Sequence, residues 1–448
     1  MDGTGLTRVL AGEAAAPDYD DLSPPARELA RQCVLDYFGV ALAGAGDELV
    51  RLLLEELCEA GGTPQASVIG HEMRLPALSA ALVNGAAAHA LDYDDVNMAM
   101  PGHPSVAILP GVLALAELNQ SSGREVITAF VAGYETACRI GAALQPGHYN
   151  LGFHSTGTVG TFGAAAACSR LLGLDGEATA IALGIAGTQA AGLKSLFGTM
   201  CKPFHAGKAS QNGLLAARLA ARGFSSRADI VECVQGFALT HGPDFSPEAA
   251  LATPEAGLHL FANLFKYHAA CYLTHAPIEC ARRLREQNRV TPEAIAGIIL
   301  RLDASCERVC NIPAPLDGLQ SKFSLRQTVA MALAGVDTAS LAAYSAENAR
   351  DSGLVGLRER LTIEWQESWP QTLAELELRL TDGRQVTARH DAGIPAADIA
   401  EQGGRLAYKF DALVEPVLGA PRTRELRETI AGLDRLTDIG GLTRLASG

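Results

Sequence analysis

Aromatic side chains are scarce in this chain of 448 residues, since Phe, Trp and Tyr together make up only 5% of it. Charged residues are also few, at 19%, and the acidic ones outnumber the basic ones to give a net charge of −14. This balance argues against nucleic acid or an anionic membrane as the main partner. It leaves room for an anionic substrate, because a site can be locally basic inside an acidic protein.

Membrane spans, export signals and disulfide patterns are missing as well. No uncharged run is long enough to predict a membrane span, and the opening MDGTGLTRVL lacks the apolar stretch of a signal peptide. The ten cysteines are scattered and form no CxxC pair. We therefore expect a cytoplasmic protein with reduced, buried thiols. Cys306 and Cys310 could form half of a zinc site, but no second pair completes it.

Several catalytic and cofactor motifs are absent from the chain. There is no GxSxG, no P-loop and no HExxH. Gly157, Gly160 and Gly163 have the spacing GxxGxxG rather than GxGxxG, and no predicted strand precedes them. We expect these glycines to permit tight helix packing rather than to bind a dinucleotide.

Helical patterns dominate the first part of the chain. Hydrophobic residues make up 48%, and many of them are alanines, so the sequence predicts a mostly helical body whose helices approach closely. A first helix is predicted to begin near Ser23, where prolines occupy the first turn. Further helices are predicted over 47–60, 78–91, 105–118, 123–144, 157–172, 176–193 and 206–221.

The character of the sequence changes after Phe265. Strands are predicted over 295–303, 361–365, 373–381 and 385–390, and the last two are joined by an Asp-Gly turn. Helices return over 406–418 and 422–433. The fold class is therefore mostly α, with a large, discontinuous helical domain (1–265 and 400–448) and a smaller α+β domain (266–399).

The first candidate segment for chemistry is LDYDDVNMAMPGHPS, which carries Asp92, Asp94, Asp95 and His103 between two apolar helices. Catalytic groups commonly lie on loops held by buried elements. A solvated, acidic helix cap is the alternative. A calcium loop is excluded, because its glycine and glutamate positions hold Asn97 and His103.

The second segment, GHYNLGFHSTGTVG, places His154 directly before a predicted helix. The free N–H groups and the dipole of a helix N-terminus favour a carboxylate. The third segment, GTMCKPFHAGKASQNG, gathers Lys202, His205 and Lys208. These cations suit an acidic ligand, and a solvated basic cluster is the alternative.

The fourth segment is LFKYHAACYLTHAPIE at the predicted domain junction, and it holds Lys266, His268, Cys271 and His275. Clefts between domains are common ligand sites. Metal binding is possible here, but no set of ligands has zinc or calcium spacing, and several lysines would repel a cation. We therefore expect a site without metal.

The four segments together resemble the MmgE/PrpD family, which includes 2-methylcitrate dehydratase, cis-aconitate decarboxylase and iminodisuccinate epimerase. The resemblance rests on ALDYDD followed by HPS, on FHSTGTVGTFGAAAA, on MCKPFHAGKASQNG and on KYHAACYLTH, and it continues to the C-terminal KF and PVLG. It implies a helical domain and an α+β lid with the active site between them. It also implies a homodimer and no metal or organic cofactor.

The resemblance also implies a set of site residues. The family's catalytic positions fall on Asp92, His103, His154, Lys202 and Lys266. We add substrate-binding candidates from the same segments and from the FSL stretch: Cys271, His275, Lys208 and Gln327.

Three positions depart from the decarboxylase pattern, because Val96, Cys271 and Gln327 stand where a Thr, a His and a Tyr are expected. The segments KYHAACYLTH and HAGKASQNG look most like the epimerase-like branch.

The function that we expect is a dehydratase-like lyase acting on a small di- or tricarboxylate by removal of a proton beside a carboxylate. An epimerase or isomerase of an amino- or imino-dicarboxylate is the main alternative, and cis-aconitate decarboxylation is less favoured. A catalytically inactive helical protein kept for dimerisation is the alternative from another class. In the enzyme readings Lys202 and Lys266 hold carboxylates, His103 and His154 carry protons, and Asp92 orients a histidine or takes the proton.

Overall fold

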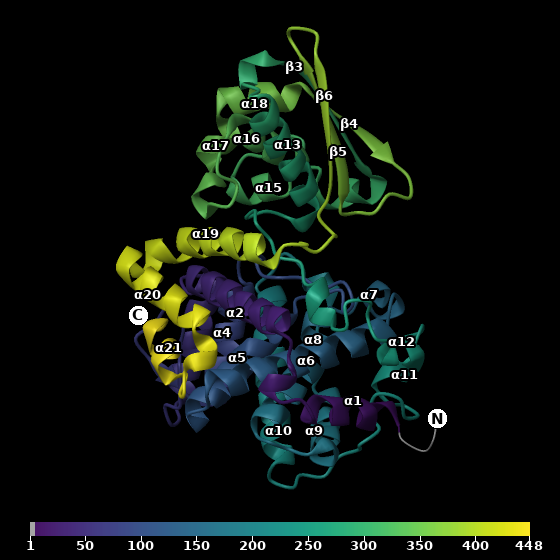
Figure 1. Cartoon of the computed structure of the whole chain (residues 1–448), viewed down its shortest axis with the longest axis vertical. Helices are drawn as coiled ribbons and strands as arrows, with labels where there is room; N and C mark the ends of the chain where they lie inside the picture. Colours follow the sequence, from purple (N-terminus) through teal and green to yellow (C-terminus); the bar gives the residue numbers. More distant parts are fainter. Residues whose placement is uncertain (1–4) are drawn as a thin grey trace. The chain divides into compact units, whose positions relative to one another are not determined.

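A computed structural model describes residues 5–448 of the chain. The described residues divide into two compact units (Figure 1). Unit 1 runs up to Phe265 and resumes at Ala397–Gly448, and unit 2 is Lys266–Ala396. Unit 1 is helical apart from one short hairpin, whereas unit 2 combines helices with a four-stranded sheet. The predicted fold class, mostly α with a smaller α+β part, is confirmed.

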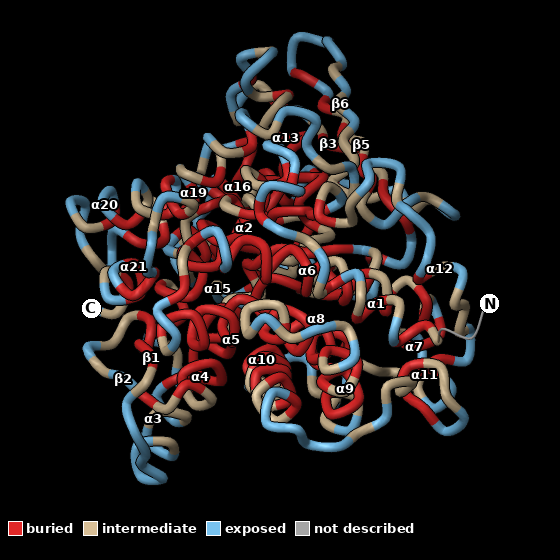
Figure 2. The backbone as a smooth tube through the Cα atoms, turned by 60° about the horizontal axis from the view of Figure 1, so that its bottom comes forward, coloured by how far each residue is buried: buried red, intermediate tan, exposed pale blue. Residues whose placement is uncertain are grey.

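The core of unit 1 is a group of long helices packed side by side. Helix α8 contacts α5, α6 and α10, while α4 contacts α2, α5 and α10. Every residue of α5 up to Glu117 and of α8 up to Ser169 is buried, as Figure 2 shows in red. The bounds of these core helices are Pro24–Gly44 (α2), Ala77–His89 (α4), Pro104–Asn119 (α5), Gly123–Ala143 (α6), Ser155–Leu171 (α8) and Cys201–Ala220 (α10).

Small residues set the distance between these helices. A Cβ added at Gly160 of α8 would lie 2.6 Å from the Ala107 Cβ of α5, and one at Gly163 would lie 2.8 Å from the Ala137 Cβ of α6. Neither distance is possible without moving a helix. The packing role that the sequence predicts for these glycines is confirmed, and both lie on the helix that begins beside His154.

Shorter elements and the C-terminal helices surround this core. The chain returns from unit 2 into α19, which packs on α2. The surrounding elements are α1 (Leu6–Ala15), α3 (Glu48–Ala60), α7 (Gly147–Leu151), α9 (Gly176–Gly187), α11 (Phe237–His241), α12 (Pro247–Leu251), α19 (Ile399–Leu418), α20 (Ala420–Ala431), α21 (Gly440–Leu445) and the hairpin of β1 (Ala66–Ser67) and β2 (Arg74–Leu75).

Two predicted helix ends are wrong near the third segment. Helix α9 ends at Gly187 instead of continuing to residue 193, because Gly192 and Leu193 pair with the backbone at His154 and Phe153. Helix α10 begins at Cys201 instead of residue 206. Pro203 is tolerated there, because N–H groups in the first turn have no partner within the helix. Lys202 and His205 therefore lie on the helix rather than before it.

Unit 2 is built on a sheet with the strand order β4-β3-β5-β6. Strand β3 pairs in parallel with β4, and β5 is antiparallel to both β3 and β6. Leucines of β5 point inward in alternation, while Arg301 bridges Glu364, Glu375 and Glu377 on the other face. The strands are β3 (Ile295–Asp303), β4 (Leu361–Gln366), β5 (Leu373–Leu380) and β6 (Gln385–Asp391).

Helix α13 covers this sheet by packing on β5 and β6, and α16 packs on α13 and α18. The helices of unit 2 are α13 (His275–Asn288), α14 (Glu307–Cys310), α15 (Gly318–Lys322), α16 (Leu325–Ala334), α17 (Ala346–Arg350) and α18 (Ser352–Glu359).

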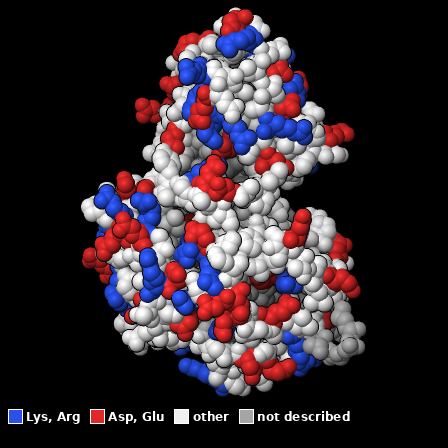
Figure 3. Space-filling model, viewed as in Figure 1, with Lys and Arg blue, Asp and Glu red and all other residues white. Residues whose placement is uncertain are grey.

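The structure can be compared with three further predictions, on membrane spans, surface charge and cysteines. None of the helices within residues 5–448 has the length and hydropathy needed to cross a bilayer. Acidic and basic side chains are interspersed over the face drawn in Figure 3. All ten cysteines are free thiols, but Cys58 and Cys201 are exposed, so the prediction of buried thiols is wrong for these two.

Candidate active site

The acidic loop between α4 and α5 has an unusual backbone. Asp92 has φ = 50°, a left-handed conformation that is uncommon for a residue other than glycine. Tyr93, Asp94 and Asp95 follow it and are fully buried or nearly so. The loop therefore presents the Asp92 side chain, which is 40% exposed, and withdraws the next carboxylates from water.

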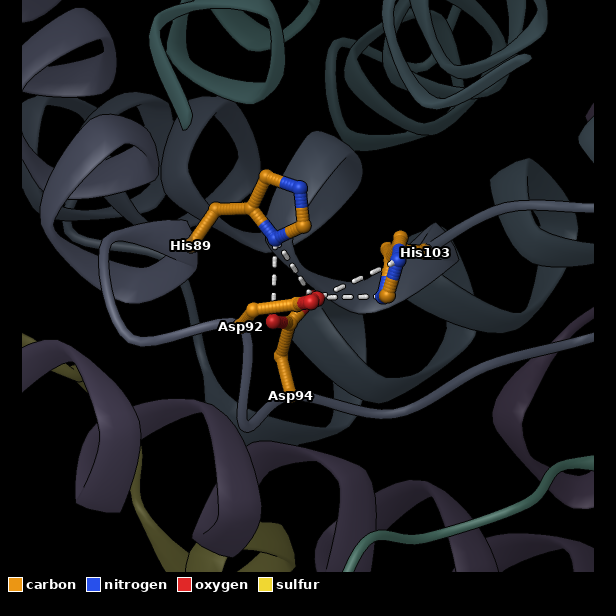
Figure 4. A group of neighbouring side chains, drawn as sticks. All are labelled: His89, Asp92, Asp94 and His103. Carbon is orange, nitrogen blue, oxygen red and sulfur yellow. Dashed lines mark hydrogen bonds and ion pairs between the residues drawn. The ribbon is translucent and has the colours of Figure 1, made fainter. Parts of the chain in front are cut away.

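Asp94 accepts hydrogen bonds from two imidazoles at once. His89 Nδ1 lies 2.9 Å from Asp94 Oδ1, and His103 Nδ1 lies 3.0 Å from Asp94 Oδ2 (Figure 4). The same His103 nitrogen is 2.9 Å from the Asp95 carbonyl oxygen. Both acceptors fix a proton on Nδ1 of His103, so its Nε2 carries the lone pair and can act as a base.

Burial and charge set the protonation of this group. Burial alone would raise the pKa of Asp94, but the His89 and His103 imidazoles hold it well below its usual range. Burial lowers the pKa of His89 to about 4, against the opposing effect of Asp94. At neutral pH the Asp94 carboxylate is therefore ionised and His89 is neutral.

Asp92 and Lys202 form the more exposed edge of the cluster. Lys202 Nζ lies 2.8 Å from Asp92 Oδ1, and His103 Nε2 lies 3.7 Å from the same oxygen. The side chains of Lys202 and His103 are 14% and 12% exposed. A cation and an imidazole thus stand beside the carboxylate of one partly exposed side chain, an arrangement that suits a small anionic ligand.

Two helix N-termini approach the same cluster. His103 directly precedes α5, and its backbone N–H donates to Thr156 Oγ1 in the first turn of α8. His154 directly precedes α8, and its Nδ1 lies 3.0 Å from His205 Nδ1 on α10. Burial, followed by His89, Lys202 and His103, lowers the pKa of His154 well below its usual range. These helix ends and a neutral imidazole supply hydrogen-bond donors for negative charge.

Unit 2 holds the remaining catalytic candidate and two binding candidates. Lys266 is only 2% exposed. Burial, followed by His268 and Lys266, lowers the pKa of His275 well below its usual range. His268 Nε2 lies 3.2 Å from Glu279 Oε1, and its ring centroid is 5.0 Å from that of His275. Lys266, His268 and His275 thus form one buried group within this unit.

Cys271 lies in the same segment of unit 2 and is half-buried. Its backbone N–H donates to the Lys322 carbonyl over 3.0 Å. A hydrogen bond with Cys271, together with burial, raises the pKa of the Cys310 thiol.

Gln327 and Lys208 belong to hydrogen-bond networks that link neighbouring helices. The Gln327 amide donates to the Asn348 carbonyl and accepts from Arg358, so it ties α16 to its neighbouring helices. Lys208 donates to Gln211 over 2.5 Å, and Gln211 donates to the Leu78 carbonyl at the start of α4. The structure thus gathers Asp92, His103, His154 and Lys202 in unit 1, whereas Gln327 is engaged elsewhere in unit 2.

The cluster also contains residue types that bind metals. His89, Asp92, Asp94 and His103 each offer one ligand atom, and these atoms lie within 4.8 Å of one another. A cation bound to Asp92 would have to displace the Lys202 ammonium, and a cation bound to the Nδ1 atoms of His89 and His103 would have to replace the protons that Asp94 holds there. The donor set as arranged therefore suits proton transfer better than coordination.

Comparison with known proteins identifies the family of the chain. The MmgE/PrpD N-terminal domain matches residues 8–250, and the MmgE/PrpD C-terminal domain matches residues 268–435. The chain belongs to the MmgE/PrpD family. Among its MmgE/PrpD relatives, cis-aconitate decarboxylase of Aspergillus terreus is 28% identical over 99% of this chain and 96% of the relative. The Mus musculus and Homo sapiens cis-aconitate decarboxylases are also 28% identical, over 99% and 93% of this chain and 93% and 89% of their own lengths.

Two residues of this cluster are not among the site residues that the sequence predicts. His89 lies outside the four candidate segments, and Asp94 lies in the first segment without a predicted role, although Asp94 joins His89 to His103. The local signal is the imidazole of His89 at the end of the largely apolar helix α4. The sequence groups His205 with two lysines as a possible cation, whereas the structure places it against His154.

Proposed function

We propose that this chain is a cofactor-independent, dehydratase-like lyase that acts on a small di- or tricarboxylate. The observation that carries the proposal is His103, whose Nδ1 is held by Asp94 and whose Nε2 lies 3.7 Å from Asp92 Oδ1, the oxygen that Lys202 also contacts. A base held in one tautomer beside a cation is what removal of a proton next to a carboxylate requires.

The proposed reaction uses the cluster in two steps. Lys202 holds a substrate carboxylate, and His103 Nε2 takes the proton from the adjacent carbon. The imidazolium that forms is stabilised by the Asp94 carboxylate. The imidazolium, whose proton can exchange with solvent, then delivers a proton to the departing hydroxyl group, so that water leaves and a carbon–carbon double bond forms. We assign His154 to hydrogen bonding with the negative charge that develops in between, and Lys266 to a second substrate carboxylate.

Proton exchange tests this proposal across many candidate substrates at once. Purified protein is incubated in deuterated water with a panel of hydroxy di- and tricarboxylates, and products are then identified by NMR. We expect deuterium at the carbon beside one carboxylate and an unsaturated acid as product. No exchange and no product with any member of the panel would contradict the proposal.

Epimerisation is the second candidate, and the family resemblance of KYHAACYLTH and HAGKASQNG favours it. The same base would remove a proton from an amino- or imino-dicarboxylate, and the proton would return on the other face. Exchange accompanied by inversion and by no unsaturated product would replace the lyase with this alternative.

Efficient cis-aconitate decarboxylation is not expected, although the relatives named above carry that name. Cys271 and Gln327 stand where the decarboxylase pattern has a His and a Tyr, and Val96 replaces a hydroxyl with a methyl group. Gln cannot release a proton, and both ends of this amide already have partners in unit 2. We expect itaconate formation from cis-aconitate far below about 1 s⁻¹, the lower end of ordinary turnover. Turnover at or above that rate would refute this expectation.

The proposal includes a homodimer in the cytoplasm, as the family resemblance implies. Light scattering on the eluted peak of a sizing column measures the mass directly. A mass near twice the 46.8 kDa of one chain is expected.

A further inference from the structure

The C-terminal helix α19 carries a buried lysine whose position is unexpected for a surface helix. Lys409 is 2% exposed, and its ammonium lies 2.6 Å from Asp36 Oδ1 on α2. The Asp36 side chain is itself only 2% exposed. Charges are rarely withdrawn from water in this way unless both are paired. The KF motif that the sequence analysis singled out begins with this residue.

Lys409 makes a second contact that reaches the acidic loop. Its ammonium donates to the Tyr93 carbonyl oxygen over 2.7 Å and lies 4.0 Å from the centroid of the Tyr93 ring. Tyr93 is fully buried and stands between Asp92 and Asp94. The lysine therefore holds the one residue whose two neighbours carry the carboxylates of the candidate site.

The backbone at this point needs such a restraint. Asp92 has φ = 50°, and a residue other than glycine keeps that conformation only where its surroundings enforce it. Turning the peptide that follows Tyr93 would move Asp94 away from His89 and His103. It would also change the distance between Asp92 and Lys202, which is now 2.8 Å.

We propose that Lys409, paired with Asp36, is a positioning residue that holds the Tyr93 carbonyl and thereby sets the directions of Asp92 and Asp94. This inference rests on the proposed function, because it assigns a task to Lys409 within that site. It gives the return of the chain to unit 1 a role in catalysis as well as in packing.

The test removes both charges together, because Lys409→Met alone leaves Asp36 buried without its cation and risks misfolding. The double variant Asp36→Asn/Lys409→Met keeps the volume of the pair and adds no buried charge. The matched control is Gln402→Met, which breaks another contact between the same two helices, the hydrogen bond to Gln32. The control does not alter the contact with Tyr93.

We expect the double variant to lose at least about tenfold in kcat on the substrate found by proton exchange, with KM changed by less than about threefold, because misplacing catalytic groups slows turnover. The control should lower the melting temperature and leave kcat unchanged. A folded double variant with wild-type kcat would overturn the inference, and so would an equal loss of kcat in the control.

A second readout is independent of activity and so separates this inference from the proposed function. In protein labelled with ¹⁵N-histidine, Asp94 should hold His89 and His103 as single tautomers protonated at Nδ1. Their signals, assigned with His89→Asn and His103→Asn, should shift toward mixed tautomers in the double variant and stay unchanged in Gln402→Met. Unchanged tautomers in a folded double variant would overturn the positioning role, even if no carboxylate proved to be a substrate.

Discussion

At the scale of single residues, each carboxylate of the candidate site has a hydrogen-bond or ion-pair partner. Asp94 is shared by two imidazoles, Asp92 is paired with Lys202, and the buried Asp95 accepts from Ser105. Because each of these carboxylates has a definite partner, replacing a residue of the cluster has a specific expected effect.

The first residue-scale prediction concerns the base. His103→Ala should lower kcat by about 10²–10⁴, the usual contribution of general acid–base catalysis, with a smaller change in KM. His71→Ala is the control, because His71 Nε2 contacts the Ala45 carbonyl, outside the acidic loop. Steady-state kinetics of both variants measure the difference, and a fully active His103→Ala protein would make this histidine structural.

The second prediction concerns the cation. Lys202→Met keeps the apolar stem of the side chain and removes the charge, so kcat/KM should fall by about tenfold to more than a hundredfold, as expected for a charge-assisted contact of about 1.5–3 kcal/mol. Arg218→Met, in the last turn of the same helix, should leave kcat/KM unchanged. If the two variants behave alike, Lys202 does not hold the substrate.

The third prediction concerns Asp95 and pH. Burial, reinforced by the nearby Asp36, raises the pKa of Asp95 to about 7. The folded protein thus keeps this proton between about pH 4 and pH 7, whereas the unfolded chain has already released it. The contribution of Asp95 to stability is therefore present at low pH and is lost as the pH rises through about 7.

Denaturant unfolding of wild type and Asp95→Asn between about pH 4 and pH 7 tests whether Asp95 stabilises the fold less as the pH rises. The free energy of unfolding of wild type, relative to the variant, should fall by up to about 1.4 kcal/mol per pH unit between pH 4 and pH 7. A difference that stays constant, or that grows in favour of wild type, would show that Asp95 is ionised in the folded state.

At the scale of elements, the site depends on how closely α4 and α10 approach. Helix α4 ends at His89 and α10 carries Lys202 in its first turn, so their spacing helps to place both. A Cβ added at Gly207 would lie 2.1 Å from the Leu82 carbonyl oxygen, a backbone atom that cannot rotate away. Glycine is therefore required at this contact for steric reasons.

Gly207→Ala should separate the two helices. We expect a loss of about 1–3 kcal/mol in the free energy of unfolding, as for other overpacked cores, and a lower kcat because Lys202 moves. Gly12→Ala in α1 is the control, since a Cβ there meets nothing within 4 Å. That variant should be as stable as wild type or more stable by about 0.5–1 kcal/mol. Thermal melting and activity of the two variants are measured in parallel. A Gly207→Ala protein as stable and active as Gly12→Ala would contradict this steric requirement.

At the scale of the whole molecule, the proposed function needs only side chains and helix ends for its proton chemistry. Lys202 already occupies the place beside Asp92 where a cation would bind. We therefore expect activity to survive prolonged dialysis against EDTA and to gain nothing from added zinc, magnesium or calcium. Activity that EDTA abolishes and one divalent metal restores would instead assign the ligand atoms of the cluster to coordination.

Much of the architecture follows from the sequence by itself. Strand β3 coincides with the predicted 295–303, and β4, β5 and β6 end within a residue of their predictions, because alternation and the Asp-Gly turn are local signals. Helix α19 begins at Ile399, earlier than the predicted residue 406, because Asp398 caps it despite the glycines at 403 and 404. Local patterns also mark the four segments that hold Asp92, His103, His154, Lys202 and Lys266.

The tertiary structure alone decided how those side chains meet. Sequence could not show that Asp94 joins His89 to His103, that His205 contacts His154, or that Lys409 reaches the Tyr93 carbonyl from the far end of the chain. Each of these contacts depends on the packing of separate helices rather than on a local pattern. The sequence therefore specifies which residue types and helices are available. Helix packing specifies which imidazole contacts which carboxylate, because hydrogen bonds form only over distances of about 3 Å.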